Sequence, residues 1–301
     1  MKLSFIFVSV LCLWILTACQ NNSVTGEGQN EPLDDFSLDL EPGINSLSTR
    51  FGGKARKAII QTPIPYDPGE SYPIVFAFHG AEQNMEDGQS ILETIVDDNN
   101  IIGVYPQGYL NSWNTEAGVD PSNADDVGYI KYLIQLLRDE GIADTSRFYS
   151  IGYSNGGVFN YKLAIETGQF AAIASLAASF FSGTTIPESV PIISVFQIHG
   201  DSDFSVPFEG GQSMAIDISF ESAIGTANKW AIHNSINPDP VISTPFDGTT
   251  LYLFKEENNN SEIRLLKLDD TGHNIFTHNY MNSLTAINEI WDFFKDKRLD
   301  Y

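Results

Sequence analysis

Residues 148–157 read FYSIGYSNGG, a pattern that points to one class of fold. An apolar run typical of a buried strand leads into a serine that has one glycine two residues before it and another two residues after it. A helical pattern continues from Val158 to Glu166. A serine on a sharp, strained turn needs this spacing, because glycine relieves the crowding of the neighbouring backbone. The stretch therefore predicts a strand–turn–helix unit that presents Ser154 as a nucleophile.

Strand-like and helix-like segments alternate on both sides of this turn. The predicted strands cover residues 56–62, 73–78, 101–105, 148–152, 171–176, 192–198, 251–255 and 263–268. The predicted helices cover residues 90–98, 127–137, 158–166, 222–233 and 284–297. Strands that are apolar throughout belong to a mostly parallel sheet with helices on both faces. With the serine turn, this pattern predicts the α/β-hydrolase fold, with ligands bound beyond the carboxyl ends of the strands.

The loop after the strand at 73–78 is the expected source of an oxyanion hole. It reads Phe78-His79-Gly80-Ala81, and in this fold the loop supplies a second backbone N–H beside the one that follows the nucleophile. We expect the N–H groups of Ala81 and Asn155 to bind the oxyanion. His79 could be mistaken for the catalytic base, but a structural role in the loop is expected.

Two later strand ends carry an acid and a base. Asp201 and Asp203 follow the strand at 192–198, and either carboxylate could orient an imidazole. His273 follows the strand at 263–268 and is the expected base, with His278 as an alternative. The order serine, aspartate, histidine is the one that this fold uses.

Composition excludes several classes of function. The 301 residues carry a formal net charge of −23, so nucleic acid is not an expected partner. Both cysteines lie in the first twenty residues, and the five histidines are scattered, so neither a disulfide nor a metal site is expected in the folded domain. We expect no cofactor, and the domain is expected to be a monomer.

The N-terminus resembles a bacterial lipoprotein leader. Lys2 precedes a short apolar run that ends in Leu16-Thr17-Ala18-Cys19, which resembles a lipobox. We expect residues 1–18 to be a signal peptide, 19–47 a lipidated cysteine with a flexible acidic tether, and 48–301 the catalytic domain. Gln20 after Cys19 favours the outer membrane by the same resemblance. The lipid anchor would be the domain's one contact with the cell envelope membrane.

Beyond the serine turn, several motifs together resemble one known group. The chain is similar to the polyhydroxybutyrate depolymerase and feruloyl esterase group, allied to carbohydrate esterase family 1, over residues 50 to 295. The motifs are His79-Gly80, Tyr105-Pro106-Gln107-Gly108, Trp113-Asn114, Asp126-Val127-Gly128-Tyr129-Ile130, Gly152 to Gly157, His199-Gly200-x-x-Asp203 and Gly272-His273. The resemblance to His-Gly-x-x-Asp motifs selects Asp203 over Asp201. It also implies activity on polysaccharide-linked acetyl or feruloyl esters, or on hydroxyalkanoate esters.

The chain departs from the group at two places. Ala81 stands where the group often has a cysteine, and Asn274-Ile275-Phe276 stands where it often has Trp-Pro. The second difference lies beside the expected base, so it concerns the substrate rather than the hydrolytic chemistry.

The loops predict an open site. The segment between Ala178 and Ile192 is too short for a large lid, which favours bulky or polymeric esters. Tyr109 and Trp113 could form a stacking wall for a sugar or aryl group, or could simply pack the loop down. The predicted function is a serine carboxylic ester hydrolase that works through an acyl-enzyme. A serine peptidase or amidase on the same fold and a non-catalytic glycan-binding lipoprotein are the alternatives.

Overall fold

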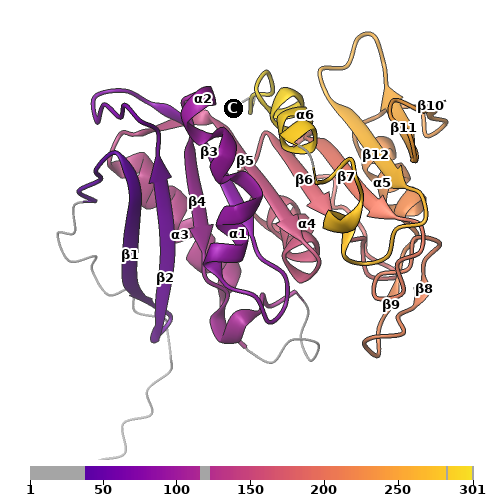
Figure 1. Cartoon of the computed structure of the whole chain (residues 1–301), viewed down its shortest axis with the longest axis horizontal. Coiled ribbons are helices and arrows are strands. Elements are labelled where there is room, and N and C mark those ends of the chain that lie inside the picture. Colours follow the sequence, from indigo (N-terminus) through magenta and orange to yellow (C-terminus); the bar gives the residue numbers. More distant parts are fainter. Residues whose placement is uncertain (1–37, 116–122, 283, 300–301) are drawn as a thin grey trace, which may run out of the picture. The chain divides into compact units, whose positions relative to one another are not determined.

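Ten strands form one sheet through the part of the chain that the structure describes. The computed structural model describes residues 38–115, 123–282 and 284–299. The strand order is β1-β2-β4-β3-β5-β6-β7-β12-β11-β10. The strands from β4 to β12 in this order run parallel, and antiparallel strands extend the sheet at both edges (Figure 1). The mostly parallel sheet predicted from the apolar runs is confirmed.

Four of the six parallel strands, β4, β3, β6 and β7, are completely buried, whereas β5 and β12 are partly exposed. Their bounds are Ile102–Pro106 for β4, Tyr72–Phe78 for β3, Ala143–Tyr153 for β5, Ala172–Leu176 for β6, Ser194–Gly200 for β7 and Glu262–Leu268 for β12. The antiparallel strands are Gly43–Phe51 for β1, Lys54–Thr62 for β2, Thr249–Lys255 for β11 and Val241–Ser243 for β10. Burial on both faces explains why the parallel strands read as continuous apolar runs.

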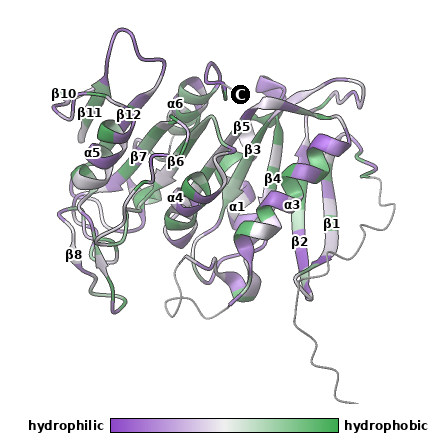
Figure 2. Cartoon of the chain, turned by 180° about the vertical axis from the view of Figure 1, so that it is seen from behind, coloured by the Kyte–Doolittle hydropathy of each residue, from purple (hydrophilic) through white to green (hydrophobic). Residues whose placement is uncertain are grey.

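Helices cover both faces of the sheet. One face carries α1 (Met85–Leu92), α2 (Val96–Asn99) and α6 (Leu284–Phe294), which lie in front in Figure 1. The other face carries α3 (Asp126–Asp139), α4 (Asn155–Thr167) and α5 (Ala223–His233), which lie in front in Figure 2. Short 3-10 turns complete the helical segments: η1 (Glu93–Ile95), η2 (Tyr109–Asn111) and η3 (Ile275–Thr277).

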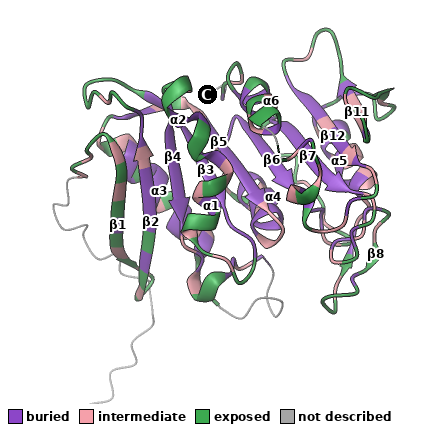
Figure 3. Ribbon diagram, in the orientation of Figure 1, coloured by how far each residue is buried: buried purple, intermediate pink, exposed green. Residues whose placement is uncertain are grey.

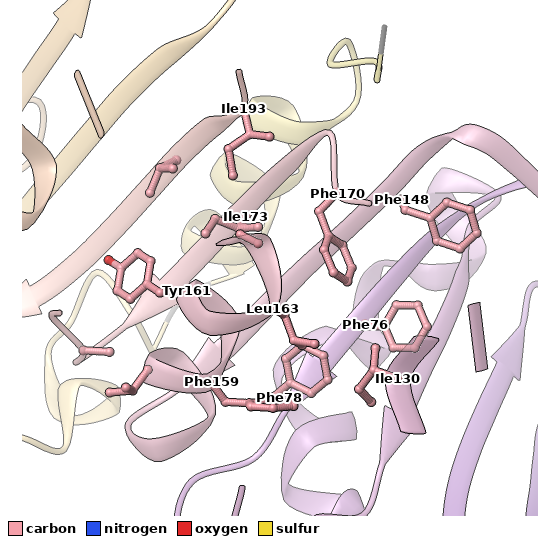
Figure 4. Packing of buried hydrophobic residues seen from close by; sticks show 14 of the residues in the cluster. Phe76, Phe78, Ile130, Phe148, Phe159, Tyr161, Leu163, Phe170, Ile173 and Ile193 are labelled. Carbon is pink, nitrogen blue, oxygen red and sulfur yellow. The ribbon is translucent and has the colours of Figure 1, made fainter. Parts of the chain in front are cut away.

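The core consists of two apolar layers, one on each face of the sheet. Figure 3 shows the buried residues concentrated in the central strands and on the inner sides of the helices. The layer under α3, α4 and α5 is rich in aromatic rings, and Figure 4 shows Phe78 and Phe159 packed together within it. Aromatic side chains bury large apolar areas and dominate the stability of such cores. The two layers fix the strand ends from which the site loops leave.

One domain boundary and one helix boundary differ from the sequence prediction. The boundary predicted at residue 48 cuts through β1, because β1 begins at Gly43 and pairs along its whole length with β2. The helix predicted over residues 90–98 begins earlier, at Met85. There the Asn84 side chain accepts a hydrogen bond from Asp87 N–H, and the Asp87 carboxylate accepts one from Asn84 N–H.

A small hairpin lies in the connection between β7 and α5. Its strands are β8 (Gly211–Gln212) and β9 (Ser219–Phe220), and they were not predicted. The connection between β6 and β7 contains no helix, although Phe181 forms an isolated bridge with Phe220.

The predicted signal peptide, Cys19 and most of the predicted tether lie outside the described residues. Within the described residues, none of the helices combines the length and the apolar character that a bilayer crossing requires.

Candidate active site

The nucleophile turn joins β5 to α4. Ser154 has φ 54° and ψ −119°, a conformation that non-glycine residues rarely adopt and that costs about 1–3 kcal/mol. The Ser154 N–H donates to the Leu176 carbonyl at 2.9 Å, and its own carbonyl accepts from the N–H of Gly157 and Val158. The helix and the neighbouring strand therefore hold the strained backbone in place.

Close backbone contacts explain the glycines around the serine. A Cβ on Gly152 would lie 2.2 Å from the Gly156 carbonyl oxygen. A Cβ on Gly156 would lie 2.4 Å from the His79 carbonyl oxygen, so the first turn of α4 presses directly on the end of β3. Both distances are too short for any side chain. The glycines thus bring the nucleophile turn against the predicted oxyanion loop.

The predicted serine, histidine and aspartate lie in one hydrogen-bonded series. The Ser154 hydroxyl donates to His273 Nε2, with 2.7 Å between Oγ and Nε2. The His273 Nδ1–H donates to Asp203 Oδ2 at 2.8 Å. A carboxylate only accepts, so this contact selects the His273 tautomer that carries its proton on Nδ1 and leaves Nε2 able to accept. The His273 side chain keeps 26% of its surface exposed, so substrate can reach it.

The Asp203 carboxylate is fully buried and stays ionised. Oδ1 accepts from the backbone N–H of Ser205 and Val206, at 2.8 and 2.9 Å. Burial by itself raises the pKa of Asp203, but the hydrogen bonds from His199 and His273 outweigh it and hold that pKa well below its usual range. A charged carboxylate can stabilise an imidazolium as it forms.

The structure separates the alternative acid and base from the serine. Asp201 Oδ2 lies 3.5 Å from the Lys267 ammonium, and its side chain is partly exposed. His278 Nδ1 accepts from the Tyr280 N–H at 3.2 Å, beside the turn before β11. Among the described residues, neither side chain is hydrogen-bonded to Ser154 or His273. Asp203 and His273 are therefore the residues whose geometry fits the two roles.

The predicted oxyanion loop is tightly folded after β3. Gly80 N–H donates to Gln83 Oε1 at 2.7 Å, and the Glu82 N–H donates to the Asn111 carbonyl at 2.8 Å. Among the described residues, the Ala81 N–H between them has no acceptor. Asn155 is the first residue of α4, where helix N–H groups face away from the helix and favour negative charge. Both predicted donors thus lie beside the serine turn.

His79 holds this loop in place through both of its ring nitrogens. Its Nδ1–H donates to the Gly80 carbonyl at 2.7 Å, and its Nε2 accepts from the Gly108 N–H at 3.0 Å. Burial lowers the pKa of His79, so the ring is neutral. Both ring nitrogens are engaged, which fits a structural role rather than that of a base.

The prediction that Trp113 offers a stacking wall to the substrate is wrong. Its side chain is fully buried, and its ring stacks on Phe159 at 4.8 Å between ring centroids. Its indole N–H donates to the His79 carbonyl at 2.9 Å, and its backbone N–H donates to the Asn155 side-chain oxygen at 2.8 Å. The ring is buried because it packs against Phe78 and Phe159, which are distant in the sequence. Trp113 therefore connects the two loops that carry the predicted oxyanion donors.

Tyr109 remains accessible. It lies in η2, its side chain is half-buried, and the Lys54 ammonium lies 5.3 Å from its ring centroid. Its predicted role in substrate binding stays a prediction.

Sequence reasoning missed Tyr153. Its ring lies 5.6 Å from the His273 ring and 5.1 Å from the Phe276 ring, and its hydroxyl donates to the His273 carbonyl at 3.2 Å. Burial, assisted by the negative charge of Asp203, raises the pKa of Tyr153 to about 12, so the hydroxyl stays protonated. A Cβ on Gly80 would lie 3.1 Å from this ring. The residue immediately before the nucleophile, for which the sequence predicted no role, thus packs between the oxyanion loop and the histidine loop.

The fold and the site together define a class. The strand order, the serine turn between β5 and α4, and the aspartate and histidine after β7 and β12 are those of the α/β-hydrolase fold. Among the described residues, no three potential metal ligands cluster together.

Within this fold, the chain is similar in sequence to proteins named as feruloyl and acetylxylan esterases. A probable feruloyl esterase C of Aspergillus clavatus is 31% identical over 169 residues, which cover 53% of this chain and 59% of that protein. A bifunctional acetylxylan esterase/xylanase of Neocallimastix patriciarum is 25% identical over 83% of this chain and 35% of that protein. The feruloyl esterase C of Emericella nidulans is 26% identical over 62% of this chain and 67% of that protein. No family model matches the chain.

Solved structures share the fold at low sequence identity. A thermostable esterase superimposes with a TM-score of 0.59 and 17% identity, over 85% of this chain and 63% of that one. The acetyl xylan esterase from Aspergillus awamori gives 0.58 and 14%, over 80% and 94% of the two chains. The poly(3-hydroxybutyrate) depolymerase LpqC from Bordetella parapertussis gives 0.54 and 16%, over 86% and 92%. The resemblance to the depolymerase and feruloyl esterase group is confirmed.

Proposed function

We propose that the protein hydrolyses carboxylic esters through a covalent acyl-enzyme. One observation carries the proposal: the Ser154 hydroxyl is hydrogen-bonded to an imidazole that a buried carboxylate orients, with distances of 2.7 and 2.8 Å. In this arrangement the imidazole can take the hydroxyl proton as the oxygen attacks a carbonyl carbon.

Each half-reaction then uses the same groups. Ser154 Oγ forms a bond to the ester carbon, and His273 Nε2 takes its proton. The N–H groups of Ala81 and Asn155 stabilise the negative oxygen of the tetrahedral intermediate. Losing one such donor typically costs about 3–4 kcal/mol of transition-state stabilisation. His273 returns the proton to the leaving alcohol, and a water molecule activated by His273 then releases the acid from Ser154.

The proposed substrates are esters carried by polysaccharides or polyesters. The sequence relatives named as feruloyl and acetylxylan esterases support this class. The chain spans 59% of the first of them and 35% of the second, so its own substrate has to be measured. The short β6–β7 connection and the accessible His273 ring support substrates too bulky for a closed pocket.

A substrate panel with two variants tests the proposal. The purified protein is assayed on p-nitrophenyl acetate, acetylated xylan, methyl ferulate, hydroxybutyrate oligomers and a peptide anilide, and is labelled with a fluorophosphonate probe. We expect ester hydrolysis and labelling in the wild type, both lost in Ser154→Ala and retained in Ser90→Ala, an exposed serine on α1. Turnover of the anilide alone would establish a peptidase or amidase. Full ester hydrolysis by Ser154→Ala would refute the nucleophile.

A further inference from the structure

The Asp203 carboxylate contacts a second imidazole. Oδ2, which accepts from His273, also lies 3.3 Å from Nε2 of His199. His199 is near the end of β7, four residues before the aspartate, and its side chain is fully buried. The carboxylate thus lies between an accessible histidine that reaches the serine and a buried one that does not.

Neighbouring groups determine which nitrogen of His199 carries the proton. Nε2 lies 2.8 Å from the Val206 carbonyl oxygen, which can only accept. The proton must therefore be on Nε2, where it is shared between this carbonyl and Asp203 Oδ2. Nδ1 is left as an acceptor and faces Nε2 of Gln197 at 3.4 Å.

Gln197 in turn has only one favourable orientation. Its Nε2 also lies 2.9 Å from the Ala178 carbonyl oxygen, so turning the amide over would set two oxygens against each other. In the orientation observed, its Oε1 is buried with no hydrogen-bond partner among the described residues. A buried amide oxygen without a partner is unfavourable by itself. The structure keeps this arrangement, and with it the donor that faces His199.

His199 is also unable to serve as the general base. Its Nε2 is committed to the Val206 carbonyl, and its ring meets the edge of Phe208 at 5.8 Å between centroids. Any effect that it has on the chemistry must pass through Asp203.

We propose that His199, with its tautomer set by the Val206 carbonyl on one side and Gln197 on the other, is a positioning residue that holds the Asp203 carboxylate in the orientation needed to align His273. The proposal deepens the proposed function and rests on it. With His199 present, Oδ1 accepts from two backbone N–H groups, and Oδ2 accepts from His273 at 2.8 Å and lies 3.3 Å from the N–H-bearing Nε2 of His199. These four contacts from different directions restrict rotation of the carboxylate. Without His199, Oδ2 would keep a single partner, and that partner is itself on a loop.

Two substitutions at His199 separate positioning from packing. His199→Phe keeps a ring against Phe208 but removes the donor, and His199→Gln places an amide N–H close to the position of Nε2. We expect His199→Phe to lower kcat for p-nitrophenyl acetate by about tenfold to hundredfold, the range for a hydrogen bond to a charged group, with KM changed by less than about twofold. We expect His199→Gln to recover kcat to within about threefold of the wild type.

Proton NMR supplies a readout that does not depend on turnover. The His273 Nδ1–H proton, hydrogen-bonded to a buried carboxylate, should give a downfield resonance in the wild type. We expect this resonance to shift or broaden in His199→Phe and to return in His199→Gln. If wild-type protein neither cleaves esters nor labels with the probe, the proposed function fails, while the resonance still reports on the orientation of the carboxylate.

Several outcomes would overturn the proposal. A folded His199→Phe protein with wild-type kcat and an unchanged resonance would do so. So would equal losses of kcat in both variants, because packing alone would then explain them. If His199→Phe does not fold, Gln197→Leu tests the same chain of contacts from Gln197 through His199 to Asp203, because it removes the donor to His199 Nδ1. We expect a lower kcat and a shifted His273 resonance in this variant. An unchanged kcat and resonance in Gln197→Leu would also refute it.

Discussion

Replacing Trp113 with phenylalanine tests whether this ring is a structural connection or a substrate contact. The substitution removes the indole N–H and leaves the His79 carbonyl without its 2.9 Å donor in a buried setting. A buried acceptor left unpaired costs about 1–3 kcal/mol. The smaller ring, three heavy atoms short of an indole, also leaves a void against Phe159; at about 24 cal/mol per Å³, a void of roughly 40 Å³ adds about 1 kcal/mol. We therefore expect the free energy of unfolding to fall by about 2–4 kcal/mol.

Urea denaturation measures this loss directly. With a slope of about 3 kcal/mol per M, the midpoint should move down by about 1 M while the slope itself stays constant. Because the ring does not reach the surface, the ratio of KM values for methyl ferulate and p-nitrophenyl acetate should not change. Tyr109→Ala is the matched variant: its half-buried ring lies on the neighbouring turn, so the KM for the aryl ester should rise with little loss of stability. An unchanged midpoint in Trp113→Phe, with a KM raised only for methyl ferulate, would show that the ring meets substrate and that this reasoning is wrong.

Three other changes give distinct results. Asp203→Asn should lower kcat by about 10⁴-fold through the wrong imidazole tautomer, whereas Asp201→Asn should leave kcat near wild type in the same ester assay. Gly156→Ala would place a methyl group 2.4 Å from the His79 carbonyl, so thermal denaturation should show a loss of about 3 kcal/mol or more; a normal melting temperature would contradict the close contact. Burial raises the pKa of Glu262, but three cationic neighbours outweigh this effect and hold that pKa below its ordinary value. The stability that ionised Glu262 contributes is therefore complete above the pKa of the unfolded state and is lost as the pH falls from there through the lower pKa of the folded state. Glu262→Gln should therefore be less stable than wild type near pH 7, with a difference that narrows near pH 3.

The sequence could predict the parallel core because its signal is local. Strands buried on both faces must be apolar throughout, and each of those in the centre appears as such a run. The edge strand β1 gave no such signal, since most of its side chains alternate between exposed and half-buried. Its stability comes from backbone pairing with β2, which involves residues that lie further along the chain. The polar composition before residue 48 therefore concealed a strand.

The site divides in the same way. Ser154 and His273 stand in motifs that follow strand ends, and the topology brings such ends together. The burial of Trp113 depends on Phe159, forty-six positions away in the numbering, and no local pattern encodes it. The contact between His199 and Asp203 depends on the path of the chain between them, and the tautomer of His199 depends on the Val206 carbonyl and on Gln197. The role of a residue that acts by contacting another side chain cannot be predicted from sequence until the position of that partner is known.

The contacts of the site loops predict which variants lose stability together with activity. Trp113 joins the oxyanion loop to the nucleophile turn from inside the core, so disturbing it should weaken folding and catalysis in parallel. Tyr153 joins the oxyanion loop to the histidine loop nearer the surface, where fewer apolar contacts are lost. His199→Phe also leaves the buried Val206 carbonyl without its donor, which costs about 1–3 kcal/mol of stability. Unlike Trp113, however, His199 contacts the catalytic carboxylate, so for a similar loss of stability His199→Phe should lose far more kcat than Trp113→Phe. A plot of the loss in log kcat against the loss in unfolding free energy should therefore place Trp113→Phe near a common line and His199→Phe well off it. If both variants fell on one line, the distinction between a packing connection and a positioning hydrogen bond would have no physical content in this protein.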